Sequence, residues 1–371
     1  MSTSKPPIAS SITGAHGYAD SIQVMLVDDS AIILGLLGRT LIKDTNISIV
    51  ATASNGAQAI PLAAQHKPQI IILDIEMPEM DGITALPKLL EASPNTRIIM
   101  ASTLTQRNAY ISLKALSLGA SDYVAKPSAS NAEELGNFYR DLIEKIQALA
   151  KPKMGASSSA PSIIQAKPIV LVKAPPVTTV KALAIASSTG GPQALKILFN
   201  GIRGQFKNIP IFITQHMPPV FTAILADNLA KEGDRHCVEG KEGMAVKAGE
   251  TYVAPGDHHM LAEKTDAGVI LRLNQEPPEN FCRPAADPML RSLSKIYGST
   301  LFTIVLTGMG SDGAEGAKVV VNNGGHVVAQ DEASCVVWGM PRAAAEAGVC
   351  RAILPLNDIA PYLIRTFGYA T

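Results

Sequence analysis

QVMLVDD at residues 23–29 and QIIILDI at residues 69–75 decide the fold of the first half of the chain, because each is an almost unbroken apolar run that contains aspartate near its end. Three further runs follow at similar spacing: SIVATAS (48–54), RIIMAS (97–102) and SDYVAKP (121–127). Helix-length segments separate the five runs. Apolar strands that alternate with helices are typical of a parallel sheet covered on both faces. The pattern therefore predicts a five-stranded parallel α/β domain.

Polar residues stand where these apolar runs stop. Asp28 and Asp29 end the first run, Asp74 the third, Ser102 the fourth and Lys126 the fifth. Ligands of open parallel sheets bind beyond the carboxyl ends of the strands, so we expect these side chains to converge. Three clustered carboxylates repel one another, and a hard divalent cation such as Mg²⁺ would stabilise them. The cluster predicts a phosphorylation site in which one carboxylate forms an acyl-phosphate beside a metal and a lysine.

Each acid taken alone is also compatible with a helix N-cap, since Asp and Ser lead the cap preferences. Together, however, the motifs of residues 22–147 closely resemble the response-regulator receiver domain, which has a flavodoxin-like (βα)5 fold. The resemblance implies a role for six residues: Asp74 as phosphoacceptor, Asp28 and Asp29 as metal-site acids, Ser102 as switch hydroxyl, Tyr123 as switch aromatic and Lys126 as the conserved lysine of the family pattern.

Length and composition limit the number of domains and the classes of partner that the chain can have. A chain of 371 residues predicts two or three domains. The 32 basic and 32 acidic residues balance, which argues against nucleic-acid binding, and no apolar stretch is long enough to span a membrane. The four cysteines form no CxxC pair, so we expect reduced thiols. We predict a cytoplasmic protein with no direct membrane insertion, whose residues 1–21 form a flexible tail.

The composition changes in the middle of the chain. Residues 148–180 are rich in proline and small polar residues and predict an interdomain linker. From 181 to 371 strands, tight turns and helices alternate again, which predicts a second, doubly wound α/β domain. Residues 248–274 contain Pro-Gly and Asp-Ala-Gly turns and predict antiparallel hairpin strands inserted into it.

Three residues of this second half stand at predicted strand ends: Ser188 in ASSTGG, His216 in ITQHMPP and Asp312 in LTGMGSDG. A serine hydroxyl needs an imidazole to remove its proton, and the imidazole needs a carboxylate to set its tautomer. The glycine-rich turns after Ser188 and around Met309 offer backbone amides for an oxyanion. The three residues predict a serine hydrolase site.

Simpler readings exist for these residues. Ser188, Thr189 and Asp312 each suit a helix N-cap. The SSTGG turn also suits a phosphate cradle, although it matches neither common glycine-rich nucleotide motif. The pair His258 and His259 suggests a metal site, yet consecutive residues of a strand face opposite ways.

The motifs of residues 181–368 together resemble the catalytic domain of the chemotaxis protein-glutamate methylesterases, the CheB family. The resemblance implies that Ser188, His216 and Asp312 carry catalysis without a cofactor, with Thr189 and Met309 near the oxyanion. The chain departs from the family pattern at two places. Ala186 and Ser187 stand where the family commonly has Gly-Ala, which makes Ser187 a competing nucleophile, although the register with Thr-Gly-Gly favours Ser188. Cys282 stands where many members carry histidine. For Cys282 itself, a partly buried packing residue is the simplest reading.

The resemblance implies a function for the whole chain. We expect a phosphorylation-activated esterase that demethylates glutamate methyl esters, and deamidates glutamines, on methyl-accepting chemotaxis receptors. A cognate histidine kinase would supply the phosphoryl group. Two other classes remain open at this point: a non-enzymatic signalling adaptor and a DNA-binding response regulator. The balanced charge and the lack of a helix-turn-helix signal count against the second.

Overall fold

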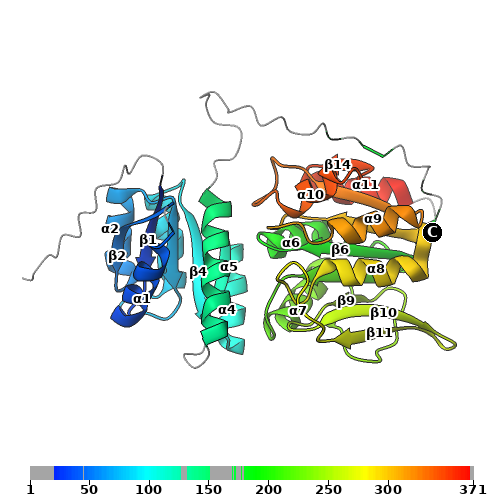
Figure 1. Cartoon of the computed structure of the whole chain (residues 1–371), viewed down its shortest axis with the longest axis horizontal. Helices are drawn as coiled ribbons and strands as arrows, with labels where there is room; N and C mark the ends of the chain where they lie inside the picture. Colours follow the sequence, from blue (N-terminus) through cyan, green and yellow to red (C-terminus); the bar gives the residue numbers. More distant parts are fainter. Residues whose placement is uncertain are drawn as a thin grey trace, which may run out of the picture.

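The structure is a computed structural model in which two α/β domains lie side by side (Figure 1). The described residues are 21–44, 46–126, 132–150 and 179–367, together with Ile169, Leu171, Val172 and Val177. The predicted tail therefore lies almost wholly outside the described residues, as does most of the predicted linker. No helix within the described part of the chain is both long and apolar enough to cross a membrane.

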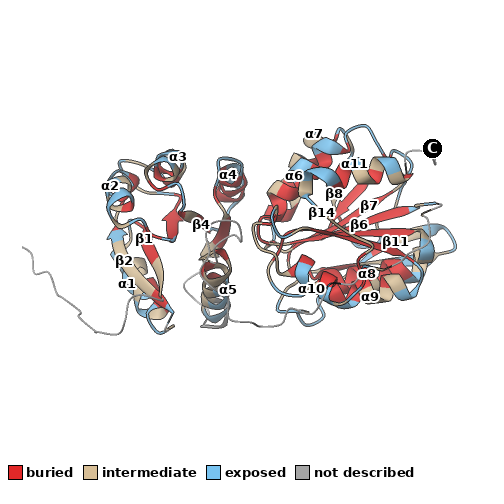
Figure 2. Cartoon of the chain, turned by 90° about the horizontal axis from the view of Figure 1, so that it is seen from above, coloured by how far each residue is buried: buried red, intermediate tan, exposed pale blue. Residues whose placement is uncertain are grey.

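The first domain is built on a parallel five-stranded sheet of order β2-β1-β3-β4-β5. Helices α1 and α5 cover one face, and α2, α3 and α4 cover the other (Figure 2). Its elements are β1 (Ile22–Val27), α1 (Ala31–Leu41), β2 (Ile47–Ala53), α2 (Gly56–His66), β3 (Ile70–Asp74), α3 (Gly82–Ala92), β4 (Arg97–Thr103), α4 (Gln106–Ser117), β5 (Asp122–Lys126) and α5 (Ala132–Ala150).

Alternate residues of the central strands pack under different helices, which explains why the runs are apolar throughout. Ile71 and Leu73 of β3 lie in the core beneath α2 and α3, whereas Ile70 and Ile72 lie in the core beneath α1 and α5. All four side chains are nearly completely buried. The predicted (βα)5 fold is therefore confirmed.

The second domain is built on a parallel seven-stranded sheet of order β14-β13-β12-β6-β7-β9-β8. Helices α6, α7 and α11 cover one face, and α8, α9 and α10 the other (Figure 2). The elements are β6 (Ala182–Ser187), α6 (Gly191–Gly201), β7 (Ile211–Gln215), α7 (Phe221–Gly233), β8 (Cys237–Glu239), β9 (Thr251–Val253), β10 (His259–Thr265), β11 (Gly268–Asn274), α8 (Ala286–Tyr297), β12 (Leu301–Val305), α9 (Ala314–Asn322), β13 (His326–Gln330), α10 (Met340–Glu346), β14 (Ala352–Leu354) and α11 (Leu356–Phe367).

The hairpin insertion is shorter than the sequence suggested. Strands β10 and β11 form an antiparallel pair that turns after Thr265, as the Asp-Ala-Gly signal predicts. β9, which lies in the same predicted hairpin region, instead pairs in parallel with β7 and β8 of the main sheet. Its three residues are fully buried, which suits a central strand.

The two domains contact each other through α4, β5 and α5 of the first domain (Figures 1 and 2). Helix α4 packs against α6 and α7. The Tyr123 ring stacks on Phe221 with centroids 4.6 Å apart and planes inclined by 8°. The first domain thus covers the N-terminal ends of α6 and α7.

The core around Phe302 offers a test of the second domain. Phe302 is fully buried and meets Phe367 edge to face at 4.8 Å. Phe302→Ala should lower the free energy of unfolding of this domain by about 3–5 kcal/mol, because it leaves a cavity. Denaturation followed by the fluorescence of Trp338, the one tryptophan of the chain, reports this domain alone. Ile197→Ala, at a 42% exposed site, is the control; equal losses for both variants would contradict the packing.

Candidate active site

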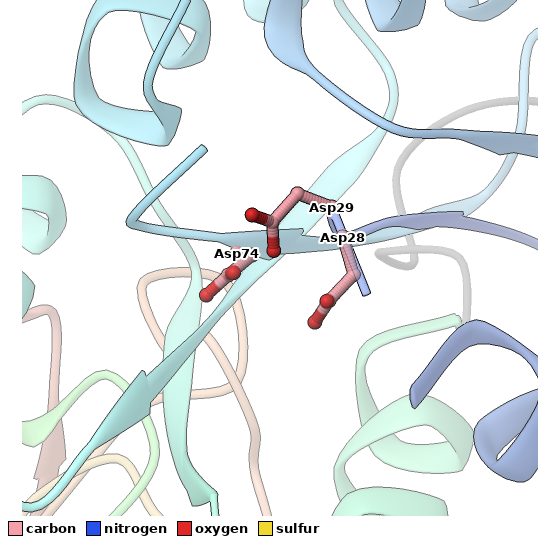
Figure 3. Close-up of side chains that lie close together, drawn as sticks. All are labelled: Asp28, Asp29 and Asp74. Carbon is pink, nitrogen blue, oxygen red and sulfur yellow. The ribbon is translucent and has the colours of Figure 1, made fainter. Parts of the chain in front are cut away.

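The first cluster of polar side chains lies at the carboxyl edge of the five-stranded sheet. Ligand oxygens of Asp28, Asp29 and Asp74 all lie within 4.8 Å of one another (Figure 3). Lys126 Nζ lies 2.6 Å from Asp28 Oδ2 and 2.7 Å from Asp74 Oδ1. The structure therefore brings together the three acids and the lysine that the strand ends predicted.

The charge balance of this cluster suits a hard cation. Burial raises the pKa of Asp74, the Lys126 ammonium opposes that shift, and the Asp28 charge adds to it. Asp29 is exposed, whereas Asp28 and Asp74 are buried. One ammonium leaves two negative charges uncompensated, and carboxylate oxygens are the ligands that Mg²⁺ prefers. These residues fit a magnesium ion.

The two predicted switch residues point elsewhere. Ser102 is fully buried, and its hydroxyl accepts a hydrogen bond from Ser112 at 3.0 Å. Tyr123 faces the second domain, where it stacks on Phe221. The structure therefore places Tyr123 at the domain interface, a position that no local sequence signal indicates.

The second cluster lies at the carboxyl edge of the seven-stranded sheet. Ser188 follows β6, His216 follows the neighbouring β7, and Asp312 lies in the loop after β12, on the other side of β6. His216 Nε2 lies 2.7 Å from Asp312 Oδ2. Among the described residues, the Ser188 hydroxyl has no hydrogen-bond partner. Bonds between nucleophile and base are often long before substrate binds, so the arrangement suits nucleophilic catalysis.

The Asp312 carboxylate is held by the start of α8. It accepts hydrogen bonds from the backbone amides of Ala286 at 2.5 Å, Asp287 at 3.1 Å and Gly313 at 2.9 Å. Burial works against its charge, but His216 and these amides lower the pKa of Asp312. The positive end of the α8 dipole acts in the same direction. Asp312 therefore stays ionised beside the imidazole, and it caps α8 rather than the helix that follows it.

Ser187 and Ser188 occupy different environments. Ser187 is fully buried and donates to Gln215 Oε1 at 2.7 Å, while Gln215 Nε2 donates to the Ser188 carbonyl at 2.9 Å. The cap residue of α6 is Gly190, and no side chain caps that helix. A Cβ on Gly308 would lie 2.9 Å from Ser188 Cβ, so the glycine permits a close approach. The geometry favours Ser188 as the nucleophile.

Two backbone amides beside Ser188 remain open. Neither the Thr189 nor the Met309 amide donates a hydrogen bond to any other described residue. The Thr189 side chain does have a partner, since it donates to Asp122 Oδ2 of the first domain at 2.7 Å. The open amides suit an oxyanion site between the two loops.

No histidine among the described residues belongs to a group suited to a metal ion. His259 is buried and bonds the Pro277 carbonyl at 3.2 Å and the Ala285 amide at 3.2 Å. The acids Asp28, Asp29 and Asp74 form the one cluster suited to a metal in the described residues. The histidine-pair hypothesis is therefore not supported.

Two family models match the chain: the response regulator receiver domain over residues 24–136 and the CheB methylesterase over residues 183–363. The chain is 45% identical to a protein-glutamate methylesterase/protein-glutamine glutaminase of Rhodospirillum rubrum, covering 97% of this chain and 98% of that protein. It is 46% identical to one of Rhodopseudomonas palustris, covering 94% of each. The chain belongs to the CheB methylesterase family. A solved catalytic domain of Thermotoga maritima CheB is 38% identical, with a TM-score of 0.49, and covers 50% of this chain and 98% of that one.

The predicted family and fold class are thus confirmed, as is the prediction of a hydrolase joined to a receiver domain. Three residues of the site were missed from the sequence. Gln215 directly precedes His216 at a strand end, and Asp122 directly precedes Tyr123, so position alone offered a weak signal for both. Asn280, whose side-chain amide donates to Asp312 Oδ1 at 3.2 Å, had none, because its contact spans 32 residues.

The charges around His216 generate a pH prediction. Burial opposes its charged form, but Cys282 and Asp312 raise the pKa of His216 well above its usual value, and the Asp141 carboxylate of α5 also acts on it. Labelling of Ser188 by a fluorophosphonate needs the neutral imidazole. Its rate in the unphosphorylated chain should therefore rise with pH through neutrality and beyond. A rate that levels off at or below the ordinary histidine pKa would contradict this electrostatic account; Ser188→Ala is the blank.

Proposed function

We propose that this chain hydrolyses methyl esters of glutamate side chains on methyl-accepting chemotaxis receptors, and that its receiver domain controls access to the site. The observation that carries the proposal is the His216–Asp312 pair, which stands next to the loop of Ser188: Gln215 Nε2 donates to the carbonyls of both Ser188 and His216, and Thr189, the residue after Ser188, donates to Asp122 of the receiver. The curated relatives are named for both methylesterase and glutaminase activity, so glutamine amides form the second substrate class.

The reaction follows from the tautomer of His216. Asp312 only accepts hydrogen bonds, so Nε2 carries the proton and Nδ1 is the base. Nδ1 takes the Ser188 proton while Oγ attacks the ester carbonyl, and the Thr189 and Met309 amides bind the oxyanion. The imidazolium returns the proton to the leaving methoxide, which departs as methanol. Water then attacks the acyl-enzyme with the same base, releasing glutamate and Ser188; with a glutamine amide, ammonia leaves instead.

The receiver domain carries the proposed phosphorylation site, which would regulate the esterase. Asp28, Asp29 and Asp74 would hold Mg²⁺, which when bound neutralises phosphoryl oxygens. Asp74 is the proposed phosphoacceptor, Lys126 would pair with the phosphoryl group, and Ser102 would exchange Ser112 for a phosphoryl oxygen. The phosphoryl donor is a cognate histidine kinase, which places the protein in the cytoplasm. No cofactor is required for the esterase step.

Contacts at the domain interface couple the two sites. Asp122 of the receiver accepts from the Thr189 hydroxyl at 2.7 Å, and the Leu116 carbonyl accepts from Gln193 of α6 at 2.9 Å. Tyr123 stacks on Phe221 at the start of α7. Thr189 directly follows Ser188, so the Asp122 contact lies next to the edge that carries Ser188 and His216. Phosphorylation at Asp74 would shift the docked state towards an open one, because Tyr123 belongs to both the switch and the interface.

A pair of variants separates the two sites. Ser188→Ala should abolish methanol release from methylated receptor, by a factor on the order of 10⁴ or more, and retain phosphorylation of Asp74 by acetyl phosphate. Asp74→Asn should retain the basal esterase rate and lose its stimulation. Substantial methanol release by Ser188→Ala would refute the serine assignment. A purely adaptor role would leave both variants, like the parent, without any methanol release.

The interface itself is tested at Asp122. A hydrogen bond to a charged acceptor contributes about 1.5–3 kcal/mol, so Asp122→Ala should raise the basal esterase rate by roughly tenfold or more. The stimulation by phosphodonor should shrink in proportion. Glu91→Ala, which removes an exposed acid of α3, controls for the change in charge. A basal rate equal to that of the parent would show that Asp122 does not hold the docked state.

A further inference from the structure

The loop from Glu279 to Cys282 has an unusual backbone. Asn280 and Phe281 both adopt left-handed conformations, with φ of 51° and 62°. The Cys282 amide donates to the Glu279 carbonyl at 2.9 Å, and the Glu279 carboxylate pairs with Arg291 of α8. Two consecutive left-handed residues other than glycine are costly and persist only where their surroundings impose them. The backbone strain raises the question of what this loop positions.

Two of the three consecutive side chains Asn280, Phe281 and Cys282 reach residues of the candidate active site. Asn280 Nδ2 donates to Asp312 Oδ1 at 3.2 Å and to Asp287 Oδ2 at 3.1 Å. Cys282 Sγ lies 3.3 Å from His216 Nδ1. Phe281, between them, stays 76% exposed.

Phe281 is also a point of contact with the receiver. The Arg140 guanidinium of α5 lies over its ring, 4.9 Å from the centroid. A contact of this kind at an exposed site shifts an equilibrium by about two- to fivefold. One residue away on each side, the loop touches the base and the carboxylate of the active site. The position of α5 is therefore linked to the active site through a single short segment.

The contact of Cys282 with His216 conflicts with catalysis. Asp312 fixes the imidazole proton on Nε2, which leaves one lone pair, on Nδ1. That lone pair must accept the Ser188 proton, yet the Cys282 thiol is placed to donate to it. If the thiol proton passes to Nδ1 instead, the lone pair is equally unavailable. In the docked state the base is therefore engaged by a group other than the nucleophile.

We propose that Cys282 is an inhibitory positioning residue that occupies the base of the active site, and that the loop of residues 279–282 makes this contact depend on receiver docking through Arg140 and Phe281. The inference rests on the proposed function of Ser188 and His216. When α5 leaves, Phe281 loses Arg140, the loop relaxes, and Cys282 releases Nδ1 to Ser188. Inhibition then has two parts, since the receiver covers the site and the loop disables the base.

The experiment measures fluorophosphonate labelling of Ser188 in the full chain, with and without acetyl phosphate and Mg²⁺. The reagent is small, so its rate responds to the state of His216. Cys282→Ala should raise the rate without phosphodonor at least threefold and reduce the stimulation by the same factor. Cys282→Ser, which keeps a donor at this position, should stay close to the parent. An unchanged or lower rate for Cys282→Ala would overturn the proposal.

Arg140 tests the link from the receiver without altering the catalytic domain. Arg140→Ala should raise the unstimulated rate about two- to fivefold, and Arg39→Ala on the distant α1 should not. In the double variant with Cys282→Ala, the Arg140 change should add nothing further, because both act through the same lone pair. Fully additive effects would refute the loop connection.

A spectroscopic readout distinguishes this mechanism from simple uncovering of the site. The ¹⁵N shift of His216 Nδ1 should move towards that of a free imidazole nitrogen in Cys282→Ala while the domains stay docked. An identical shift in parent and variant would overturn the contact. Loss of labelling in Ser188→Ala tests the proposed function separately, so the two ideas fail in different experiments.

Discussion

The stacking of Tyr123 on Phe221 is the contact on which the arrangement of the whole chain depends. It joins the core beneath α2, α3 and α4 of the receiver to the core beneath α6 and α7 of the catalytic domain, so that the two form one continuous cluster of buried residues. Tyr123 follows directly on Asp122, which binds Thr189. The aromatic contact therefore helps to fix the position of the proposed phosphorylation site relative to the proposed esterase site, which shares no residues with it.

A buried lysine and two acids lie around Tyr123 at the domain interface. Lys145 of α5 donates to the Tyr123 carbonyl at 2.7 Å and lies near the carboxylates of Asp122 and Asp141. Burial alone would lower the pKa of Lys145, but these two acids raise it. Because a buried charge without a partner is strongly destabilising, the ammonium allows two receiver acids to face the catalytic domain. One of them is the acceptor for Thr189, so the same network supports both the fold and the docked state.

The catalytic pair depends on long-range support of a different kind. Asp312 is held by the start of α8 and by Asn280, and Asn280 also binds Asp287, whose pKa is raised to about 6 by burial and by the nearby Asp312. The carboxylates of Asp287 and Asp312 can lie close together because amide groups donate hydrogen bonds to both of them. The loop that supplies Asn280 also supplies Cys282, so the group that stabilises the acid comes with the group that engages the base. Because Phe281 of the same loop contacts Arg140 of the receiver, the hydrogen bonds to Asp312 and His216 are linked to the docking of the receiver domain.

Most of the fold and both clusters of functional residues could be predicted from the sequence, for a physical reason: parallel strands bring their carboxyl ends to one edge, so residues that end apolar runs must meet there. Asp28, Asp74 and Lys126 meet in this way, and the backbone of His216 bonds that of Ser187, next to Ser188. The sequence by itself therefore determined two α/β domains and the side chains that gather at the carboxyl edge of each sheet. Only the tertiary structure decided that Asp122 binds Thr189, that Tyr123 stacks on Phe221, and that Cys282 lies against His216. Such contacts join residues far apart in the chain through loops and an interface, where no strand periodicity constrains what meets.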